Sequence, residues 1–242
     1  MLEKLFFELA SESRLSILLE LKNENLKMQE IARRLNVTAT EACRQLERLS
    51  KASLIQRQPD GTFALAQYGK IVLEISSSLD FVSKYNEYFS THDLMRLPSQ
   101  FVNRIGELSE ADLEMDMIKN IDKGSQAFLE AEQYGWGMGE SRAPEQMTSV
   151  MNQRVQEGLN LRSLIPENRI PTVASPELPK NVEVRCIPDV PAIVVLTEKM
   201  AGVCLRQIGG RMDFAGFFGN DPTFHRWAED LFLYYWNKSK RF

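Results

Sequence analysis

The chain has 242 residues, a length at which two domains are expected. Hydrophobic residues make up 43% and charged residues 26%, the composition of a globular protein with an apolar core. The sequence has no run of about 18 apolar residues, which argues against a membrane-spanning helix. Its first residues, MLEKLFFELASESRL, lack a signal-peptide pattern. We therefore expect a cytoplasmic protein that does not engage a membrane.

The cysteines and histidines form no recognisable metal-binding pattern. Cys43, Cys186 and Cys204 are far apart in the sequence and include no CxxC pair. His92 and His225 stand at no metal-ligand spacing from them. We expect neither a metal site nor a cofactor. We expect a protein of a reducing compartment, whose cysteines act as small core residues.

The charge of the chain is unevenly distributed. The net charge is −4, with a sequence pI near 5.5, which would disfavour a nucleic-acid partner if it were uniform. The segment 27–57, however, holds seven Lys and Arg against three Glu, a local charge of +4. Because phosphate neutralisation supplies the sequence-independent part of DNA affinity, this segment is the candidate DNA-docking region.

Apolar spacing predicts a series of short helices at the N-terminus. Leucines and Phe6 recur at helical spacing within residues 2–9, and a second apolar stripe follows over residues 15–21. A third helix is expected over 28–35, then a turn at Asn36-Val37 and a fourth helix capped by Thr38 or Thr40. In this fourth helix we expect Ala42, Cys43, Leu46 and Leu49 to face inward. The order is that of a helix-turn-helix.

A hairpin is predicted directly after the fourth helix. Asp60-Gly61 stands between the short runs Gln56-Arg57-Gln58 and Thr62-Phe63-Ala64-Leu65, a strong hairpin pattern. A hairpin in this position is the wing of a winged helix-turn-helix. The alternative is a small helical domain with an incidental hairpin, but the complete order of elements and the basic charge favour the winged helix.

The segment IARRLNVTATEACRQLERLSKASLI, followed by the PDG turn, resembles winged-helix regulators of the arsenic-repressor-like superfamily. This resemblance implies a double-stranded DNA partner. Many of those regulators bind metals through pairs of Cys and His, and this sequence lacks such pairs. The resemblance therefore implies DNA binding but not metal sensing.

Residues of the fourth helix and the hairpin are the candidate DNA contacts. Arg and Gln suit bidentate contacts with guanine and adenine, and basic residues at the helix end and wing suit the phosphate backbone. Arg33 and Arg34 are expected to touch phosphate or solvent. The predicted DNA-binding residues are Thr38, Thr40, Glu41, Arg44, Gln45, Arg48, Lys51 and Arg57.

A linking helix is predicted over residues 68–90. Its apolar positions alternate by four and three residues, the seam spacing of a coiled coil. These positions are Tyr68, Val72, Ile75, Leu79, Val82, Asn86 and Phe89. One interpretation is a helix that pairs with its twin in a homodimer, which would give two recognition helices for a palindromic site. The other is a helix packed against its own C-terminal domain.

The remaining residues, 91–242, are predicted to form an α/β domain with a mixed sheet. We expect helices up to residue 131, over 144–157 and over the aromatic segment 222–238. Strands are expected over 134–138, 159–165, 182–187, 192–197, 202–208 and 213–217, and Pro166, Pro171, Pro176 and Pro179 mark an irregular connection. The domain boundaries are therefore 1–67, 68–90 and 91–242.

The segments THDLMRLP, EGLNLRSLIP, VEVRCIP and FHRWAEDLFLYYW resemble the C-terminal domain of archaeal methanogenesis-regulator-like transcription factors. That resemblance implies a phospholipase-D-like sheet after the winged helix. Phospholipase-D chemistry needs a Lys two positions after its His, but His225 is followed by Arg226 and Trp227 and His92 by Asp93 and Leu94. No serine nucleophile elbow or P-loop occurs, and Gly135, Gly137 and Gly139 lack GxGxxG spacing. We therefore expect no enzyme and no catalytic residue.

Four residues near predicted strand ends are candidates for a ligand crevice: Trp136, Arg162, Arg185 and Arg206. An aromatic face with guanidinium groups suits an anionic or planar effector, whereas the alternative is a core tryptophan with surface or salt-bridged arginines. The sequence thus predicts a homodimeric DNA-binding transcriptional regulator with a ligand-sensing or assembly domain. The alternatives are a winged-helix protein-interaction module and an enzyme with a regulatory winged helix.

Overall fold

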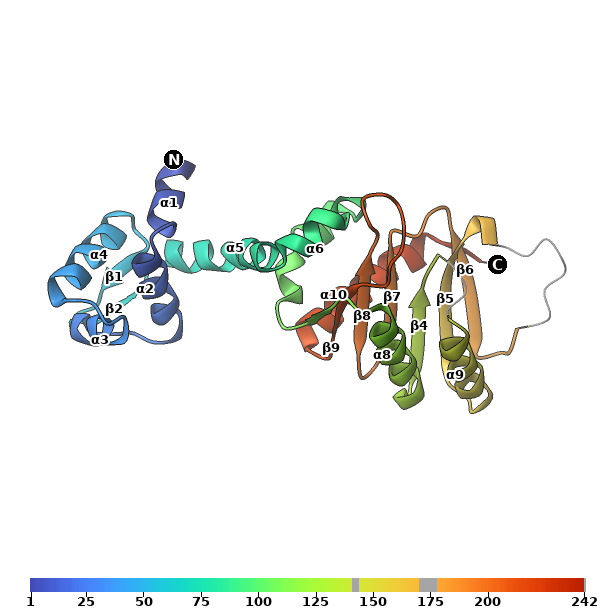
Figure 1. The fold of residues 1–242 in the computed structure, drawn as a ribbon. Coiled ribbons are helices and arrows are strands. Elements are labelled where there is room, and N and C mark those ends of the chain that lie inside the picture. Colours follow the sequence, from blue (N-terminus) through green and yellow to red (C-terminus); the bar gives the residue numbers. More distant parts are fainter. Residues whose placement is uncertain (141–143, 170–177, 242) are drawn as a thin grey trace. The chain divides into compact units, whose positions relative to one another are not determined.

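The computed structural model describes residues 1–140, 144–169 and 178–241. The chain divides into two compact units, Met1–Ser77 and Ser78–Phe242 (Figure 1). Pro171 and Pro176, which the sequence places in an irregular connection, lie outside the described residues.

The first unit contains four helices around a small apolar core. They are α1 (Leu2–Leu9), α2 (Glu12–Asn23), α3 (Met28–Arg34) and α4 (Ala39–Lys51), at the positions predicted from the sequence. Ile17, Ile31 and Leu46 are among the side chains buried between them. The prediction that Cys43 faces inward is wrong: Cys43 is exposed.

Three residues of the first unit have a positive φ: Asn36, Ser53 and Gly61. Asn36, between α3 and α4, has a φ of 52°, a left-handed conformation that asparagine tolerates better than most residues. The hairpin pairs β1 (Ile55–Arg57) with β2 (Phe63–Leu65), with Ile55 opposite Leu65. Gly61 in the connecting loop has a φ of 84°, a conformation open to glycine. The predicted turn and hairpin are therefore both present.

The helix predicted over 68–90 is two helices in the structure. α5 (Gln67–Lys84) ends at Tyr85, whose φ of −110° and ψ of 34° leave the helical region, and α6 (Asn86–Thr91) follows. Val72 and Leu73 pack into the core of the first unit, whereas Phe81 packs into the core of the second. α5 therefore contributes to both cores.

A mixed sheet forms the centre of the second unit, as predicted, and within the described residues it has eight strands. Its strand order is β10-β6-β5-β4-β7-β8-β9-β3, with β4, β5 and β6 parallel and the other pairings antiparallel. The strands are β3 (Asp112–Glu114), β4 (Tyr134–Met138), β5 (Asn160–Pro166), β6 (Val182–Ile187), β7 (Ala192–Thr197), β8 (Ala201–Leu205), β9 (Gly216–Gly219) and β10 (Lys240–Arg241).

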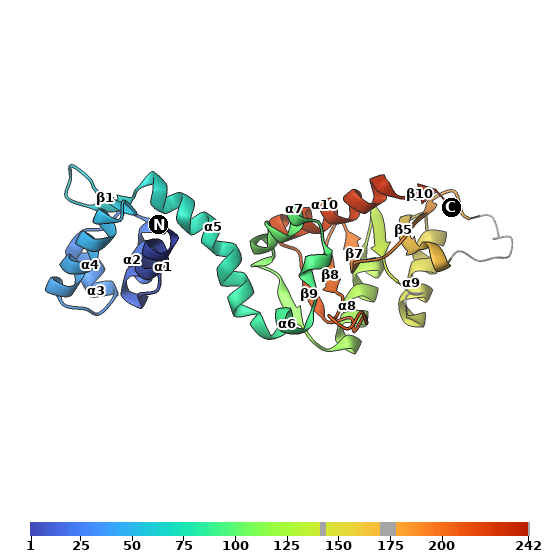
Figure 2. The ribbon, with the colours of Figure 1, turned by 90° about the horizontal axis from the view of Figure 1, so that it is seen from above.

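Helices cover both faces of this sheet (Figure 2). One face, here called the α10 face, packs against α10 (Pro222–Lys238) and α7 (Ser99–Val102). The opposite face, the α8/α9 face, carries α8 (Met117–Glu130) and α9 (Glu145–Gln156). Short 3₁₀ turns occupy Leu94–Arg96, Ile105–Leu108 and Glu167–Arg169.

Some predicted elements of the second unit differ from those observed. The strand predicted over 202–208 ends at Leu205, and the strand predicted over 213–217 begins only at Gly216. Between them Phe214 has a φ of 63°, which no strand residue adopts. The short strands β3 and β10 were not predicted, because two or three residues show no alternation.

Candidate functional site

The start of α4 is fixed by a side-chain cap. Thr38 Oγ1 accepts a hydrogen bond from the backbone N–H of Glu41 at 3.1 Å, so Thr38 is the N-cap residue. On the inner side of the helix, Leu46 and Leu49 pack into the core with Ile31 of α3. The cap and these contacts hold α4 with one side toward the solvent.

Seven residues of α4 are exposed, and five of them are here called the outer stripe: Thr40, Cys43, Arg44, Glu47 and Lys51. The other two are Ala39 and Ser50. The spacing of three and four residues within the outer stripe places its members on one helical face. Thr40, Arg44 and Lys51 were predicted DNA contacts. Cys43 and Glu47 were missed, although the helical period that includes Arg44 and Lys51 also selects them.

Within the outer stripe, Arg44 forms an ion pair. Its side chain is 66% exposed and its Nη2 lies 2.9 Å from Glu41 Oε1. Hydrogen bonding to Glu41 raises the pKa of Arg44, and hydrogen bonding to Arg44 lowers the pKa of Glu41. An exposed pair of this kind stabilises a protein little, so Arg44 can exchange Glu41 for a phosphate or a base edge at low cost.

The prediction that Gln45 lies on the exposed face of α4 is wrong, whereas Arg48 is partly exposed and engaged in an ion pair. Gln45 is 5% exposed, and its Oε1 accepts a hydrogen bond from Arg14 Nη1 at 3.1 Å. Arg48 Nη2 lies 2.8 Å from Glu8 Oε1, and its guanidinium lies 5.1 Å from the centre of the Phe7 ring. These two residues attach α4 to α1 and α2, because their partners Glu8 and Arg14 belong to those helices. The sequence of α4 alone does not indicate these contacts.

The hairpin adds one predicted contact, Arg57, to this region. Arg57 is exposed at the end of β1, and Asp60 in the loop accepts hydrogen bonds from the N–H and hydroxyl of Thr62. A cavity of about 490 Å³ between α4 and the hairpin is lined by Glu47, Lys51 and Arg57 among others. Lys51 and Arg57 therefore stand at one groove between α4 and the hairpin.

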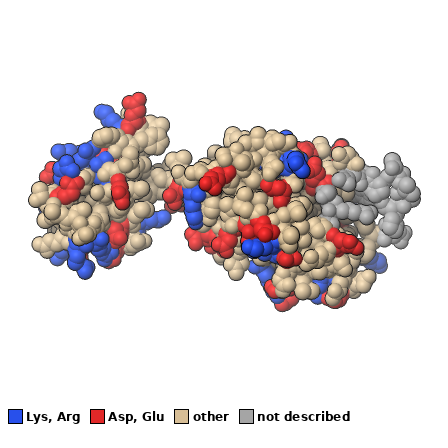
Figure 3. Space-filling model, viewed as in Figure 1, with Lys and Arg blue, Asp and Glu red and all other residues tan. Residues whose placement is uncertain are grey.

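The positive charge of the first unit is smaller than its local sequence suggests. Arg34 pairs with Glu20 of α2 and with Glu24 just after that helix, and Arg48 pairs with Glu8 of α1. Over residues 1–77, eleven Lys and Arg stand against ten Asp and Glu, a net charge of +1. Figure 3 shows this mixture, with basic and acidic atoms side by side on the first unit. Four basic residues of the segment 27–57 make no ion pair with the described residues 1–140, 144–169 and 178–241: Lys27, Arg33, Lys51 and Arg57.

Three of the four predicted ligand residues lie together on the α10 face. The Arg162 guanidinium stands 4.9 Å from the Trp136 ring centre and 5.2 Å from that of Trp236. Arg185 lies 4.3 Å from the Trp236 ring centre and pairs with Glu183 at 2.8 Å. These alternating rings and guanidinium groups pack α10 onto β4, β5 and β6. Trp236, the shared ring, was not predicted.

Arg206 does not join this group. Its side chain is 6% exposed, and it donates hydrogen bonds to the carbonyl oxygens of Val190 (2.7 Å) and Gly210 (2.6 Å). It also pairs with Glu140 at 3.1 Å. The prediction of one crevice lined by all four residues is therefore wrong, since Arg206 holds together the loops at the end of β8.

Within the part of the chain that the structure describes, no three His, Cys, Asp or Glu side chains are grouped as metal ligands. Among those same residues, no helix is both long and apolar enough to cross a membrane.

Comparison with known proteins gives only remote similarities. No family model and no curated protein matches the sequence. The archaeal chromatin protein TrmBL2, whose structure is described as showing a novel mode of DNA binding, is 14% identical over 90% of this chain and 88% of its own, with a TM-score of 0.44. NucT from Helicobacter pylori is 9% identical over 55% of this chain and 99% of its own, with a TM-score of 0.45. Both scores are low, and neither similarity decides the fold or the function of this chain.

Proposed function

We propose that the chain is a winged-helix regulator that binds double-stranded DNA through the outer stripe of α4 and the β1–β2 hairpin. The observation that carries the proposal is the capped helix α4, which follows α3 after a tight turn and presents Thr40, Arg44 and Lys51 to solvent. A helix-turn-helix places such a helix in the major groove, and a following hairpin reaches the backbone. Arg44 would read guanine, whereas Lys51 and Arg57 would contact phosphates.

The test is a fluorescence-anisotropy titration of a labelled duplex from the region upstream of the gene, at several salt concentrations. We expect Arg44→Ala to weaken binding by about 1–3 kcal/mol and to relax base preference. Lys51→Ala and Arg57→Ala should each reduce the salt slope by about 1 with little change in base preference.

The matched control is Arg226→Ala, which removes the same charge from an exposed position of α10. Its affinity and salt slope should equal those of the unaltered chain. If Arg44→Ala behaves like Arg226→Ala, the outer stripe is not the DNA-binding surface. Binding lost equally in all four variants would also contradict the proposal.

We propose further that the protein acts as a homodimer through α5. Four apolar residues of this helix, Tyr68, Ile71, Ile75 and Leu79, are exposed by 46–69%. Their spacing of three, four and four residues makes one continuous stripe, and exposed apolar stripes of this kind favour pairing with a second helix. Val82 and Phe89, also assigned to the seam, instead pack against the core of the second unit.

Ile75→Asp tests this interface because Ile75 is 69% exposed and supports no core. We expect the variant to be monomeric by light scattering while its helix content stays unchanged. Ser77→Asp, which adds the same charge at an exposed position on another side of α5, should remain a dimer. If the mass of Ile75→Asp by light scattering equals that of the unaltered chain, α5 does not form the dimer interface.

For the second unit we propose ligand sensing rather than catalysis. Both histidines are engaged with protein groups: His225 Nε2 lies 2.6 Å from the Thr197 carbonyl oxygen, and His92 is 2% exposed beside Asp213. A nucleophile or general base needs access to a substrate, which favours a structural role for both side chains.

A further inference from the structure

The α8/α9 face of the sheet encloses a cavity that none of the predicted sites includes. Its volume is about 280 Å³, near the lower end of the range for small-molecule sites. Met147 and Met151 of α9, Val195 of β7 and Phe218 of β9 contribute apolar walls. Methionine walls adapt to different ligand shapes, because the side chain is unbranched and flexible.

The two glycines of β4 differ in what lies beside them, and only Gly137 borders the open space. Gly135 and Gly137 point toward the α8/α9 face. A Cβ at Gly135 would lie 2.5 Å from the Phe128 ring, so close packing requires glycine there. A Cβ at Gly137 would meet nothing nearer than the Val194 carbonyl oxygen at 4.0 Å, so packing does not require glycine. Glycine weakens a strand interior and often marks the close approach of a ligand. Its neighbour across the ladder, Ser163, is also small and lines the cavity.

The lining defines the class of ligand. Among the described residues around the cavity, Glu140 is the one with a charged side chain, and it pairs with Arg206. No cation of the lining is therefore available to bind an anion. The apolar walls favour a compact neutral molecule.

Asn120 of α8 also lines the cavity and adds a polar group to its apolar wall. It is 3% exposed, and its Nδ2 donates hydrogen bonds to the carbonyl oxygens of Glu114 (2.8 Å) and Phe214 (2.7 Å). Two acceptors on one side fix the orientation of the amide. Its Oδ1 is consequently buried without a hydrogen-bond donor. A ligand that carries an N–H or O–H group would satisfy this acceptor.

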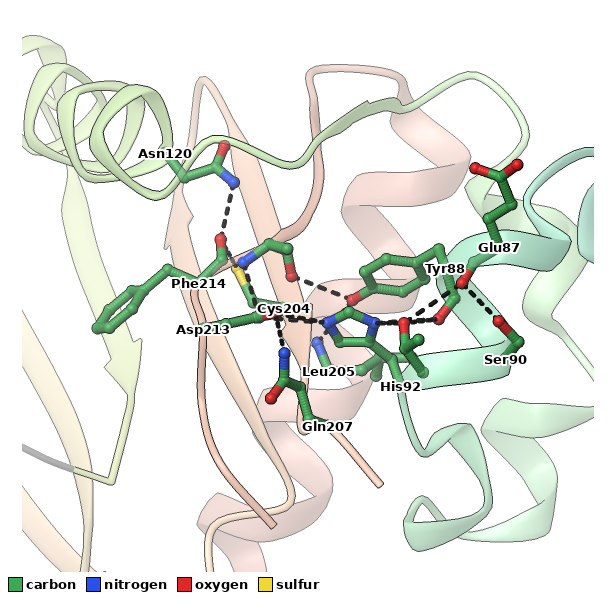
Figure 4. Close-up of polar contacts among 12 residues, drawn as sticks. Glu87, Tyr88, Ser90, His92, Asn120, Cys204, Leu205, Gln207, Asp213 and Phe214 are labelled. Carbon is green, nitrogen blue, oxygen red and sulfur yellow. Dashed lines mark hydrogen bonds and ion pairs between the residues drawn. The ribbon is translucent and has the colours of Figure 1, made fainter. Parts of the chain in front are cut away.

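The same amide is tied to a constrained loop (Figure 4). Phe214 lines the cavity and has a φ of 63°, an unfavourable conformation for an aromatic residue. Its carbonyl oxygen is held by Asn120 Nδ2 and by Cys204 Sγ, at 3.2 Å from the sulfur. Burial raises the pKa of the Cys204 thiol well above its ordinary value, so the sulfur stays protonated and can donate. Two cavity-lining side chains thus stabilise the loop conformation.

The loop in turn contacts the helix that follows α5. The Asp213 carboxylate lies 3.1 Å from His92 Nε2 and accepts hydrogen bonds from Gln207 and from the N–H of Ala215. His92 ends α6 and stacks on Tyr88 at a ring distance of 3.9 Å. Because Asn120 Oδ1 is shielded, a ligand donor can reach it only if the Asn120 amide moves. That movement would release or shift Phe214, and with it Asp213 and His92.

We propose that this cavity binds a compact, neutral, mainly apolar molecule with one hydrogen-bond donor, and that binding is transmitted through Phe214, Asp213 and His92 to α6. The regulatory consequence rests on the proposed function, since it assumes that α5 and α6 connect the ligand site to a DNA-binding unit. Ligand binding itself does not depend on that assumption.

The first experiment uses the full chain without DNA and two bicyclic probes of the same shape. Indole has an N–H donor, and benzofuran has an oxygen in its place. By isothermal titration calorimetry we expect saturable binding of indole at millimolar concentrations and about tenfold weaker binding of benzofuran, the usual worth of one hydrogen bond. Absence of indole binding, or equal affinity for both probes, overturns the ligand assignment.

A cavity-filling variant localises the site. Gly137→Leu places a side chain in the open space and should abolish indole binding, whereas Gly209→Leu, at an exposed glycine with open space around it, should leave binding unchanged. If Gly137→Leu does not fold, methyl NMR of the unaltered protein with labelled methionines gives the same information. Indole should shift the Met147 and Met151 signals and leave that of exposed Met115 in place. Unaltered binding by folded Gly137→Leu, or unshifted Met147 and Met151 signals, overturns the proposal.

Transmission has its own measurement. Met212 precedes Asp213 and packs against the second core, so its methyl signal should shift with indole if the loop moves. An unmoved Met212 signal in the saturated protein overturns the transmission step. Addition of saturating indole to the anisotropy titration should then change the DNA dissociation constant at least severalfold. Failure of the chain to bind DNA would contradict the proposed function but would leave the binding and NMR results standing.

Discussion

The two faces of the sheet in the second unit are built from the same strands but are filled differently. On the α10 face, Trp136, Phe232 and Trp236 stack in sequence, with ring centres 5.2 and 5.5 Å apart. On the α8/α9 face, the same strand β4 carries glycines between its aromatic residues and a cavity of about 280 Å³ remains. The alternation of β4 therefore separates a face that supplies stability from a face that leaves room for a ligand.

The contrast between the two faces points to a different ligand site from the one that residue types alone suggest. Arginines and tryptophans indicate binding, yet here Arg162 and Arg185 lie against the rings of Trp136 and Trp236. Cation–π contacts of this kind contribute about 0.5–2 kcal/mol each, which suits a packing role. The open space lies on the face with the small and flexible side chains.

The largest expected effect comes from truncating the α10 face. Phe232 is fully buried between Trp136 and Trp236, so Phe232→Ala should lower the free energy of unfolding of the second unit by about 3–5 kcal/mol. Urea denaturation followed by tryptophan fluorescence measures this, because all three tryptophans belong to the second unit. A loss below about 1 kcal/mol would mean that this face is not the main source of stability.

Regular alternation and helix caps allowed much of this fold to be predicted from the sequence. The strands Val182–Ile187 and Ala192–Thr197 and the helix Pro222–Lys238 have the predicted bounds. Each is long enough to show its period, and Pro222 at the helix start is a strong local feature. β3 and β10 have no such pattern, since pairing with β9 and β6 defines them.

The candidate sites were predicted less well, because their side chains depend on partners distant in sequence. Arg48 and Gln45 lie on the predicted helix, but Glu8 of α1 pairs with the partly exposed Arg48 and Arg14 of α2 binds the buried Gln45. The cavity is open beside Gly137, where the strand carries no side chain, so no functional side chain marks it in the sequence. The alternation of glycine with large residues in YGWGM was its one available feature, because alternate residues of a strand share a face.

A smaller effect distinguishes the two glycines of β4. Gly135→Ala would place a methyl group 2.5 Å from the Phe128 ring and should destabilise the second unit by about 1–3 kcal/mol. Gly137→Ala meets open space and should leave stability unchanged or raise it by about 0.5–1 kcal/mol, because alanine reduces the entropy of the unfolded chain. Both variants are compared by urea denaturation. Equal losses at the two positions would mean that the space beside Gly137 is not open in solution.

The smallest expected effect concerns the pH dependence of the α10 face. Burial, with smaller contributions from Glu229 and Glu198, raises the pKa of Tyr134 to about 12, and burial raises that of Tyr235 to about 12 as well. In the unfolded chain a tyrosine ionises near pH 10. Below pH 10 both states hold the proton and stability does not depend on these groups. Between pH 10 and 12 the unfolded state loses protons that the folded state keeps, so the free energy of unfolding falls as pH rises.

Tyr134→Phe should therefore make the alkaline decline in the free energy of unfolding shallower. We expect the difference to stay below about 1 kcal/mol, because the side chain is only half-buried and solvent screens the neighbouring charges. Urea denaturation at intervals from pH 9 to pH 12 would measure it, with Tyr235→Phe as an independent second case and the double variant as a check on additivity. A steeper decline in Tyr134→Phe would reverse the sign and show that the folded state stabilises the ionised phenol, the opposite of the effect expected from the burial of Tyr134.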